Sequence, residues 1–151
     1  METKHISQKK MRSMSEIKNK AIVHRFIDEA YNKRNLTVGD ELLAASVVLH
    51  VSDAHIEGSV GWKQYASNFL NAFSDIVISV EDTIAEGDKV VATWTCGGIH
   101  SGELQGIAPT DKRVTWTGIA IYRFVGGRIE EVWVWNDLLS LMRQLGVGPY
   151  G

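Results

Sequence analysis

The chain has 151 residues, 44% of them hydrophobic, and a formal net charge of −2. This size and apolar content suit one domain with a single core. The balanced charge excludes the strongly basic field that draws proteins to nucleic acid or to anionic membranes, so neither is an expected partner. The single cysteine, Cys96, excludes an internal disulfide, and no apolar run approaches the roughly 20 residues of a membrane helix. No secretory signal pattern follows the first residues, so we expect a cytoplasmic protein.

Residues 1–14 are polar and basic, with four lysine or arginine side chains against a single acidic one. An arm that binds nucleic acid is one interpretation of this segment. Chain ends are usually loose, however, and we expect a flexible, solvated tail. The tail is followed by a single predicted domain at residues 15–147.

Hydrophobic periodicity predicts a helix over 16–34, a short helix over 38–45 and a third helix over 59–73. Ser13 and Glu16 have the spacing of a capping box at the start of the first helix. Apolar side chains at spacings of three and four mark one face of the first and third helices: Val23, Phe26, Ile27, Ala30 and Tyr31, and then Trp62, Tyr65, Ala66, Phe69, Leu70 and Phe73.

The rest of the chain has the pattern of β-strands. The β-branched stretch "SVVLHVS" (46–52) predicts one strand, and from Ile76 onward the period is two. Two hairpins are expected, turning at 87–88 and at 126–127, with the loop 103–112 between them. Helices followed by antiparallel strands indicate an α+β fold, in which helices cover one face of a curved sheet and the concave side is either filled or left as a cavity.

The second hairpin predicts an unusual site if Gly126 and Gly127 are its turn residues. Residues opposed across a hairpin share one face of the sheet. Regular pairing outward from this turn places Ala120 opposite Trp133, Gly118 opposite Trp135, and Trp116 opposite Asp137, and it adds Tyr122 and Glu131 to the same face. The sequence therefore predicts an aromatic pocket with a carboxylate, Asp137, at its bottom.

A carboxylate among indole rings is costly to ionise, so burial is expected to raise the pKa of Asp137. A rise of about two or three pKa units would bring the group near neutral pH. Such an acid can take a proton from a carbon acid and return it to an oxygen. The alternative is that Asp137 caps the helix predicted in "LLSLMRQL", a position that favours aspartate. The two roles are compatible.

The histidines are the next candidates. His50 and His100 lie on predicted strands, where either orients a ligand or holds a second proton, unless it is a structural side chain. His24 and His55 are expected on the surface. No pair of histidines has the spacing of a metal site, no glycine-rich phosphate loop follows a strand, and no nucleophile elbow is present. We therefore expect neither a metal nor a nucleotide.

The sequence resembles the SnoaL-like polyketide cyclases over about residues 16–146. The matching motifs are Gly98, His100 and Gly102; Pro109, Thr110 and Lys112; Tyr122 and Arg123; Gly127 and Ile129; Glu131 and Trp133; Asp137; and the stretch 144–146. The chain departs from the family pattern at Ile99, Asp111 and Gly126, and Trp94 stands where many members carry arginine, which makes the expected pocket more apolar.

This resemblance implies the cone-shaped α+β fold of the nuclear-transport-factor-2-like superfamily, with N-terminal helices packed on a strongly curved, mostly antiparallel sheet that encloses a pocket. It implies a homodimer or a higher homo-oligomer. It also implies a cofactor-free intramolecular aldol cyclisation, in which an aspartate at the position of Asp137 acts as general acid/base. Apart from the resemblance, we expect His100 or His50 to hold the developing oxyanion. The residues expected to bind the substrate are Phe26, His50, Tyr65, Phe69, Trp94, Trp116, Tyr122, Trp133 and Trp135.

We therefore expect a small acid/base enzyme that acts on an apolar, carbonyl-bearing small molecule. Two alternatives remain open at this point. One is a non-catalytic module that binds a small ligand or serves in assembly, and the other is a dehydratase or isomerase of the same superfamily.

Overall fold

The computed structural model describes residues 2–148, so that Met1 of the predicted tail lies outside the described part. The elements, in chain order, are α1 (Glu2–Ile27), the π-helix η1 (Asp28–Asn32), α2 (Val38–Leu42), β1 (Leu43–Val51), β2 (Ala54–Glu57), α3 (Gly58–Ala72), β3 (Phe73–Glu86), β4 (Lys89–His100), β5 (Arg113–Val125), β6 (Arg128–Asn136) and α4 (Leu138–Leu145).

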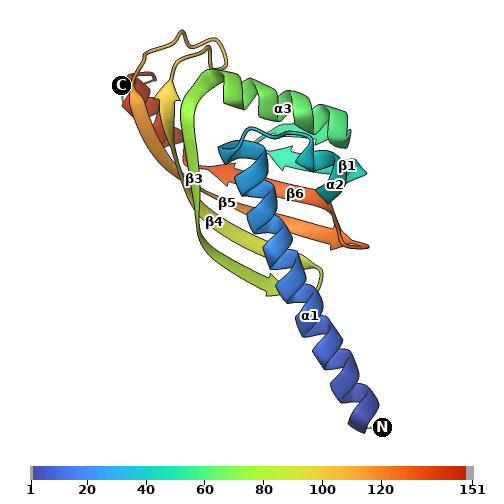
Figure 1. The fold of residues 1–151 in the computed structure, drawn as a ribbon. Helices are drawn as coiled ribbons and strands as arrows, with labels where there is room; N and C mark the ends of the chain where they lie inside the picture. Colours follow the sequence, from blue (N-terminus) through green and yellow to red (C-terminus); the bar gives the residue numbers. More distant parts are fainter. Residues whose placement is uncertain (1, 149–151) are drawn as a thin grey trace.

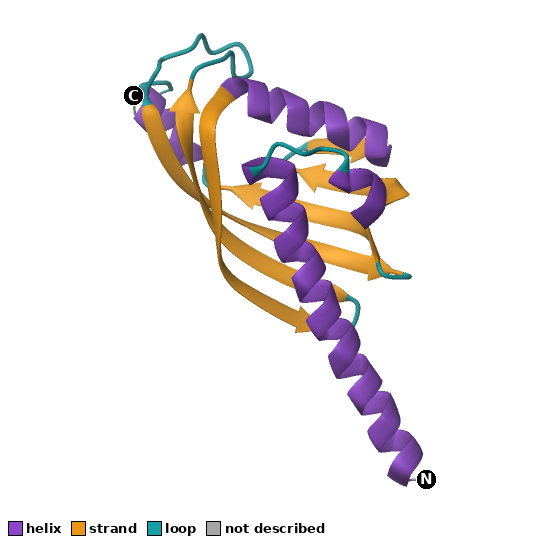
Figure 2. Cartoon of the chain, in the orientation of Figure 1, coloured by secondary structure: helices purple, strands orange, loops and turns teal. Residues whose placement is uncertain are grey.

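The strands form one sheet in the order β2-β1-β6-β5-β4-β3. Strands β1 and β6 pair in parallel, and the other neighbours pair antiparallel. The sheet curves strongly, and α1 and α3 lie over the same side of it (Figure 1; Figure 2). The predicted α+β fold with a curved, mostly antiparallel sheet is confirmed. Strand β2 had no counterpart among the predicted elements, and β1 begins three residues before the predicted strand.

The predicted start of the first helix is wrong: α1 begins at Glu2 rather than near Glu16. The predicted capping box at Ser13 and Glu16 lies inside this helix. Its N-terminal half extends beyond the sheet (Figure 1). Met11, Met14 and Ile17 of this helix are exposed. The flexible character of residues 1–14 and the domain boundary at residue 15 stay predictions.

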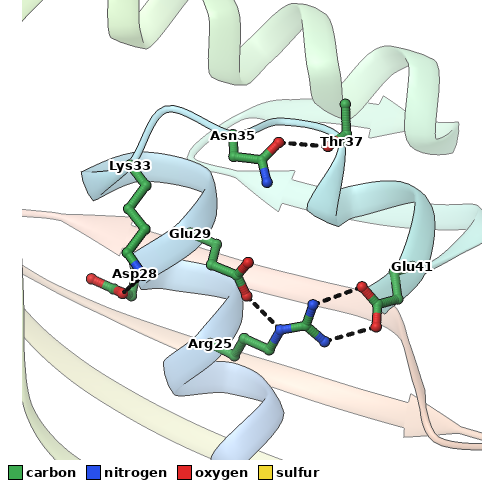
Figure 3. Close-up of polar contacts among 7 residues, drawn as sticks. All are labelled: Arg25, Asp28, Glu29, Lys33, Asn35, Thr37 and Glu41. Carbon is green, nitrogen blue, oxygen red and sulfur yellow. Dashed lines mark hydrogen bonds and ion pairs between the residues drawn. The ribbon is translucent and has the colours of Figure 1, made fainter.

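Ion pairs hold the short helix α2 against its neighbours. Arg25 of α1 donates to both carboxylate oxygens of Glu41, at 2.8 and 2.7 Å, and also to Glu29 one turn along α1 (Figure 3). On the other side, Lys63 of α3 lies 2.8 Å from a carboxylate oxygen of Asp40. These contacts fix the helices relative to one another above the sheet.

The core lies between the helices and the sheet. Trp62 of α3 is 1% exposed, and its ring lies over Gly39 so closely that a Cβ at Gly39 would overlap the indole. Phe26 of α1 contacts the same indole, with ring centroids 5.3 Å apart. Large rings therefore fill the end of the core beneath α2.

The β5–β6 hairpin has a register that differs from the predicted one. Val125 pairs with Arg128, as expected, but Glu130 has no partner, and Arg123 pairs with Glu131 instead. A β-bulge of this kind adds one residue to one strand. Because side chains alternate between faces, the bulge moves every later residue of β6 to the face opposite the predicted one.

Candidate functional site

An apolar pocket of about 70 Å³ lies between the helices and the inner face of the sheet. Here we call it the inner pocket. Half of its lining residues are aromatic, and their rings come from α1, η1, α3, β4 and β5. The lining residues are Phe26, Ile27, Tyr31, Leu43, Leu49, Trp62, Tyr65, Phe69, Ile78, Trp94, Cys96, Trp116, Tyr122, Val132, Val134 and Asn136.

A larger hollow of about 800 Å³, the outer pocket, lies between α3, α4, the β1–β2 turn and the loop after β4. Tyr65, Phe69, Trp116 and Asn136 line both pockets and so form the boundary between them. Ring contacts fix this boundary, because Phe69 meets Trp116 edge to face at 6.1 Å between centroids. A ligand that enters through the outer pocket must pass these residues.

Asn136 contributes a polar amide side chain to this boundary, and it lines both pockets. It ends β6 opposite Gly118, and its Oδ1 accepts a hydrogen bond from the Trp116 indole Nε1 at 3.3 Å. The amide is therefore oriented with its oxygen toward Trp116. Its NH₂ group remains available to donate to a ligand.

Apart from the indole N–H groups of the tryptophans, the other polar side-chain atoms of the inner pocket belong to weak acids. Burial raises the pKa of Tyr65 to about 12 and that of the Cys96 thiol to about 12. Burial likewise raises the pKa of Tyr31 and Tyr122. These groups are neutral donors at physiological pH. Among the described lining residues of the inner pocket there is no Asp, Glu, His, Lys or Arg.

Asp137 lies outside the inner pocket. Its side chain is exposed, and Oδ1 accepts a hydrogen bond from the backbone N–H of Ser140 at 3.1 Å, which caps the N-terminus of α4. It lines a shallow groove on the opposite face of the sheet, together with Trp135 and Glu81. The prediction that Asp137 shares a face with the pocket aromatics is wrong, because the bulge at Glu130 shifts the register. The capping alternative is confirmed, and the acid/base role stays a prediction.

The same shift displaces two predicted pocket tryptophans. Trp133 pairs with Ile121 and Trp135 with Ile119, so that both indoles lie on the outer face of the sheet. His50 also lies there, stacked on Trp133 at 5.5 Å, with Nε2 2.7 Å from a Glu131 oxygen. None of these three predicted substrate contacts lines the inner or outer pocket.

His100 is fully buried at the end of β4. Its Nδ1 accepts from the backbone N–H of Thr110 at 3.2 Å and lies 2.9 Å from the Thr110 hydroxyl. Accepting from an amide places the proton of the neutral ring on Nε2, which has no partner among the described residues. His100 thus ties down the loop before β5, and it lines neither pocket.

The remaining predicted substrate contacts come together. Those that line the inner pocket are Phe26, Tyr65, Phe69, Trp94, Trp116 and Tyr122. Sequence reasoning missed Asn136 as a pocket residue. One signal was present, since the regular register placed Glu131 beside Tyr122, and a bulge removes that carboxylate from an apolar face.

His24 and His55 are exposed, as expected. Within residues 2–148 there is no cluster of three or more His, Cys, Asp and Glu side chains suited to a metal ion. Across the same residues, no helix has the length and apolar character required to span a bilayer.

Comparisons with known proteins show the family to which this chain is similar. The sequence profile of the SnoaL-like polyketide cyclases matches residues 21–145. The nogalonic acid methyl ester cyclase of Streptomyces nogalater is 31% identical over 99 residues, which are 65% of this chain and 69% of that protein.

Solved structures share the fold. A candidate SnoaL-like polyketide cyclase from Jannaschia sp. CCS1 superimposes with a TM-score of 0.83 at 23% identity, over 89% of this chain and 95% of that one. AclR, a candidate hydroxylase from Streptomyces galilaeus, superimposes with a TM-score of 0.79 at 28% identity, over 89% and 88%. Because the family profile spans most of the sequence, the chain belongs to the SnoaL-like polyketide cyclase family.

Proposed function

We propose that this protein binds a neutral, apolar, carbonyl-bearing compound of the polyketide type and promotes its intramolecular aldol cyclisation without a cofactor. The observation that carries the proposal is the aromatic inner pocket with Asn136 at its mouth. Family membership and the similarity to the nogalonic acid methyl ester cyclase support the same chemistry.

The pocket walls supply the first part of the catalysis. Rings from the helices and the sheet enclose the ligand, and Phe73 packs on Trp116 at 5.1 Å behind the boundary. A chain held folded between rigid walls brings its two carbonyl arms together. Orientation of this kind lowers the entropic part of the barrier to ring closure.

Asn136 supplies the second part. Ring closure turns an acceptor carbonyl into an alkoxide, so negative charge develops on one oxygen. The NH₂ group of Asn136 can donate to that oxygen, because Trp116 holds the amide oxygen in place. Fixed donors aimed at developing charge stabilise a transition state.

The aldol step also moves a proton from carbon and delivers one to oxygen. Asp137 is the acid/base group predicted for this transfer. In the structure its Oδ1 caps α4, with the backbone N–H of Asp137 bonded to the Thr117 carbonyl at 3.0 Å. The variant Asp137→Asn separates the two roles, since asparagine caps a helix about as well as aspartate but cannot act as a base.

The test uses nogalonic acid methyl ester, with cyclisation followed by chromatography and ultraviolet absorption. We expect wild-type turnover, and a loss of about 100-fold in kcat/KM for Asn136→Leu, the typical cost of one oxyanion donor. We expect Asp137→Asn to retain the fold; loss of turnover there would assign the proton transfer to Asp137. Equal activity of wild type and Asn136→Leu would refute the role of Asn136.

A second candidate function is binding without turnover. The uncharged lining of the inner pocket favours it, because the described residues there offer no group that titrates near neutral pH. In that case the ester quenches tryptophan fluorescence on binding, yet it is recovered chemically unchanged. Formation of a cyclised product at a rate above that in buffer excludes this candidate.

A further inference from the structure

We infer that the outer pocket binds a hydroxyl-rich, non-acidic group of the ligand, such as a sugar, while the apolar part of the same ligand occupies the inner pocket. The inference rests on the proposed function and deepens it, because it names a second part of the substrate. The outer pocket is much the larger, about 800 Å³ against about 70 Å³, and Tyr65 and Asn136 line both. A compound that fills the inner pocket therefore has room to extend outward.

Polar residues from three separate elements line the outer pocket, and all of them are exposed to solvent. They are Ser52 and Asp53 of the β1–β2 turn, Asn68 and Asn71 of α3, and Glu103 and Gln105 of the loop after β4. Amide and hydroxyl groups both donate and accept hydrogen bonds, and carboxylates accept them. The hydroxyls of a sugar also donate and accept, so this lining can pair with them. The other lining residues are largely apolar, a combination typical of ligand pockets.

The charge of the outer pocket excludes an acidic ligand group. Asp53 and Glu103 line it, and among its described lining residues there is no Lys, Arg or His. A carboxylate or phosphate placed there would meet like charges without a counter-charge. The side-chain amides of Asn71 and Gln105 make no hydrogen bond within the described residues, so both are available to an uncharged hydroxyl group.

Gln105 occupies a turn position that favours other residues. Gln105 and Gly106 form a two-residue turn, because Leu104 and Ile107 exchange backbone hydrogen bonds of 3.0 and 2.8 Å. Their φ angles are 46° and 85°. A turn with positive φ at both positions normally has asparagine, aspartate or glycine first. The conformation of the turn therefore does not explain the glutamine, whereas contact with a ligand would.

Ser52 shows the same feature in the β1–β2 turn. Val51 pairs with Ala54, so Ser52 and Asp53 form a two-residue turn, and Ser52 has a φ of 52°. Glycine adopts such a conformation at far lower cost than serine. Residues held in sparsely populated conformations cluster at ligand-binding sites. Two such residues, on separate turns, line the outer pocket.

The loop after β4 is held firmly against α3. The backbone N–H groups of Ser101 and Gly102 both donate to the carbonyl of Ala72, at 3.1 and 3.0 Å. A Cβ at Gly102 would overlap the carbonyl oxygen of Asn71, so glycine permits this close approach. The polar groups of the loop and the helix are thus preorganised, which lowers the entropic cost of binding.

The experiment compares phenyl β-D-glucoside, phenyl β-D-glucuronide and methoxybenzene, three probes with the same aryl ether. NMR titration of ¹⁵N-labelled protein measures the affinities and follows the side-chain NH₂ signals of Asn71 and Gln105. We expect the glucoside to shift these signals and to bind about tenfold more tightly than methoxybenzene, the effect of one net hydrogen bond. The glucuronide should bind about tenfold more weakly than the glucoside, because its carboxylate meets like charges.

Three glycine variants separate binding from backbone strain. Gln105→Gly and Ser52→Gly each remove a pocket side chain and relieve a positive φ, and both should weaken glucoside binding by about fivefold. Asp111→Gly is the matched control, because Asp111 has a φ of 59° in the same loop but lines neither pocket. It should leave glucoside binding unchanged. Circular dichroism checks that all three variants fold.

A pair of double variants tests the charge. Asp53→Asn with Glu103→Gln should bring the affinity for the glucuronide to within about threefold of that for the glucoside, because the repulsion is removed. Asp82→Asn with Glu86→Gln is the matched control, since both residues are exposed on β3 and line neither pocket. It removes as much charge but should leave the preference for the glucoside unchanged.

Several results overturn the inference: no binding of the glucoside, equal affinity for the glucoside and methoxybenzene, equal affinity of the wild type for the glucoside and the glucuronide, or a loss in Asp111→Gly that matches the loss in Gln105→Gly. Failure of the proposed function appears differently. If the glucoside binds as expected but nogalonic acid methyl ester is not cyclised, the sugar site stands and the reaction does not. If the ester is cyclised but the glucoside binds no better than methoxybenzene, the reaction stands and the sugar site does not.

Discussion

Asn136 and Asp137 are neighbours in the chain, yet their side chains serve different parts of the molecule. Asn136 is the last residue of β6 and faces the pocket, whereas Asp137 is the N-cap of α4 and faces solvent. The cap holds the strand-to-helix junction, because the Asp137 N–H also bonds to the Thr117 carbonyl. Asp137 therefore helps to position Asn136 through the backbone.

At this scale we predict that Asp137→Ala lowers the free energy of unfolding by about 1 kcal/mol, because the first turn of α4 loses its side-chain acceptor. Asp137→Asn should change it by no more than a few tenths of a kcal/mol. Urea denaturation followed by circular dichroism measures both. Equal destabilisation by the two variants would show that the charge of Asp137, rather than its cap, supports the fold.

At the scale of elements, the bulge at Glu130 decides which residues of β6 form the pocket wall. Without the bulge, Glu131 would lie opposite Tyr122 on the apolar face, and Val132 would lie on the outer face. With it, Glu131 lies on the outer face, where Arg123 donates to it at 3.1 Å, and Val132 is 3% exposed in the core. The free energy of burying valine rather than glutamate explains the shift.

Two substitutions in β6 test this register, because one changes a residue of the inner face and the other a residue of the outer face. Val132→Glu should lower the free energy of unfolding by about 3 kcal/mol or more, since it places an unpaired carboxylate in the core. Trp135→Glu should cost the monomer less than about 1 kcal/mol, because that indole is on the outer face. Thermal and urea denaturation of the two variants compare them. If Trp135→Glu lowered the free energy of unfolding more than Val132→Glu, the register without a bulge would be the correct one.

Ion pairs between elements predict how the fold responds to acid. A hydrogen bond from His50 of β1, and then Arg123 of β5, lower the pKa of Glu131 below its ordinary 4.5. Hydrogen bonding to Arg25 of α1 lowers the pKa of Glu41 of α2 in the same way. A lowered folded-state pKa means that the unfolded chain binds protons more readily, so this stability is present above pH 4.5 and is lost as the pH falls below it.

We therefore predict that the double variant Glu41→Gln and Glu131→Gln is less stable than the wild type at pH 7, and that the difference shrinks as the pH is lowered from 4.5 to 3. Urea denaturation at several pH values gives the two curves. Asp137→Asn, which lies outside both ion-pair groups, is the control. Parallel curves over this range would show that the pairs contribute nothing to acid sensitivity.

At the scale of the whole molecule, the helices cover one face of the sheet and leave the other face open (Figure 1). Apolar side chains are exposed on that outer face, with Ile119 38% and Trp135 48% accessible, and Leu139 of the adjoining α4 is 52% accessible. Contiguous exposed apolar surface is typical of protein interfaces. We propose this surface as the contact of the predicted homo-oligomer, since a second copy would offer the same surface about a two-fold axis.

We predict a homodimer that dissociates when Trp135 is replaced by glutamate, because the new charge would be desolvated in an apolar contact. Light scattering coupled to size-exclusion chromatography measures the mass. Val125→Glu, an exposed apolar residue at the β5–β6 turn, is the matched control and should leave the mass unchanged. A monomeric wild type, or a dimer that survives Trp135→Glu, contradicts this interface.

The sequence by itself determined the class of fold, the second hairpin turn at Gly126 and Gly127, and six of the aromatic residues that line the inner pocket, Phe26, Tyr65, Phe69, Trp94, Trp116 and Tyr122. Periodicity and turn chemistry are local, so they can be predicted from neighbours in the chain. Only the tertiary structure decided that Asn136, rather than Asp137, faces the pocket. That outcome depends on one extra residue in β6, and a bulge is set by which side chains the helices and neighbouring strands will bury, which no local pattern contains.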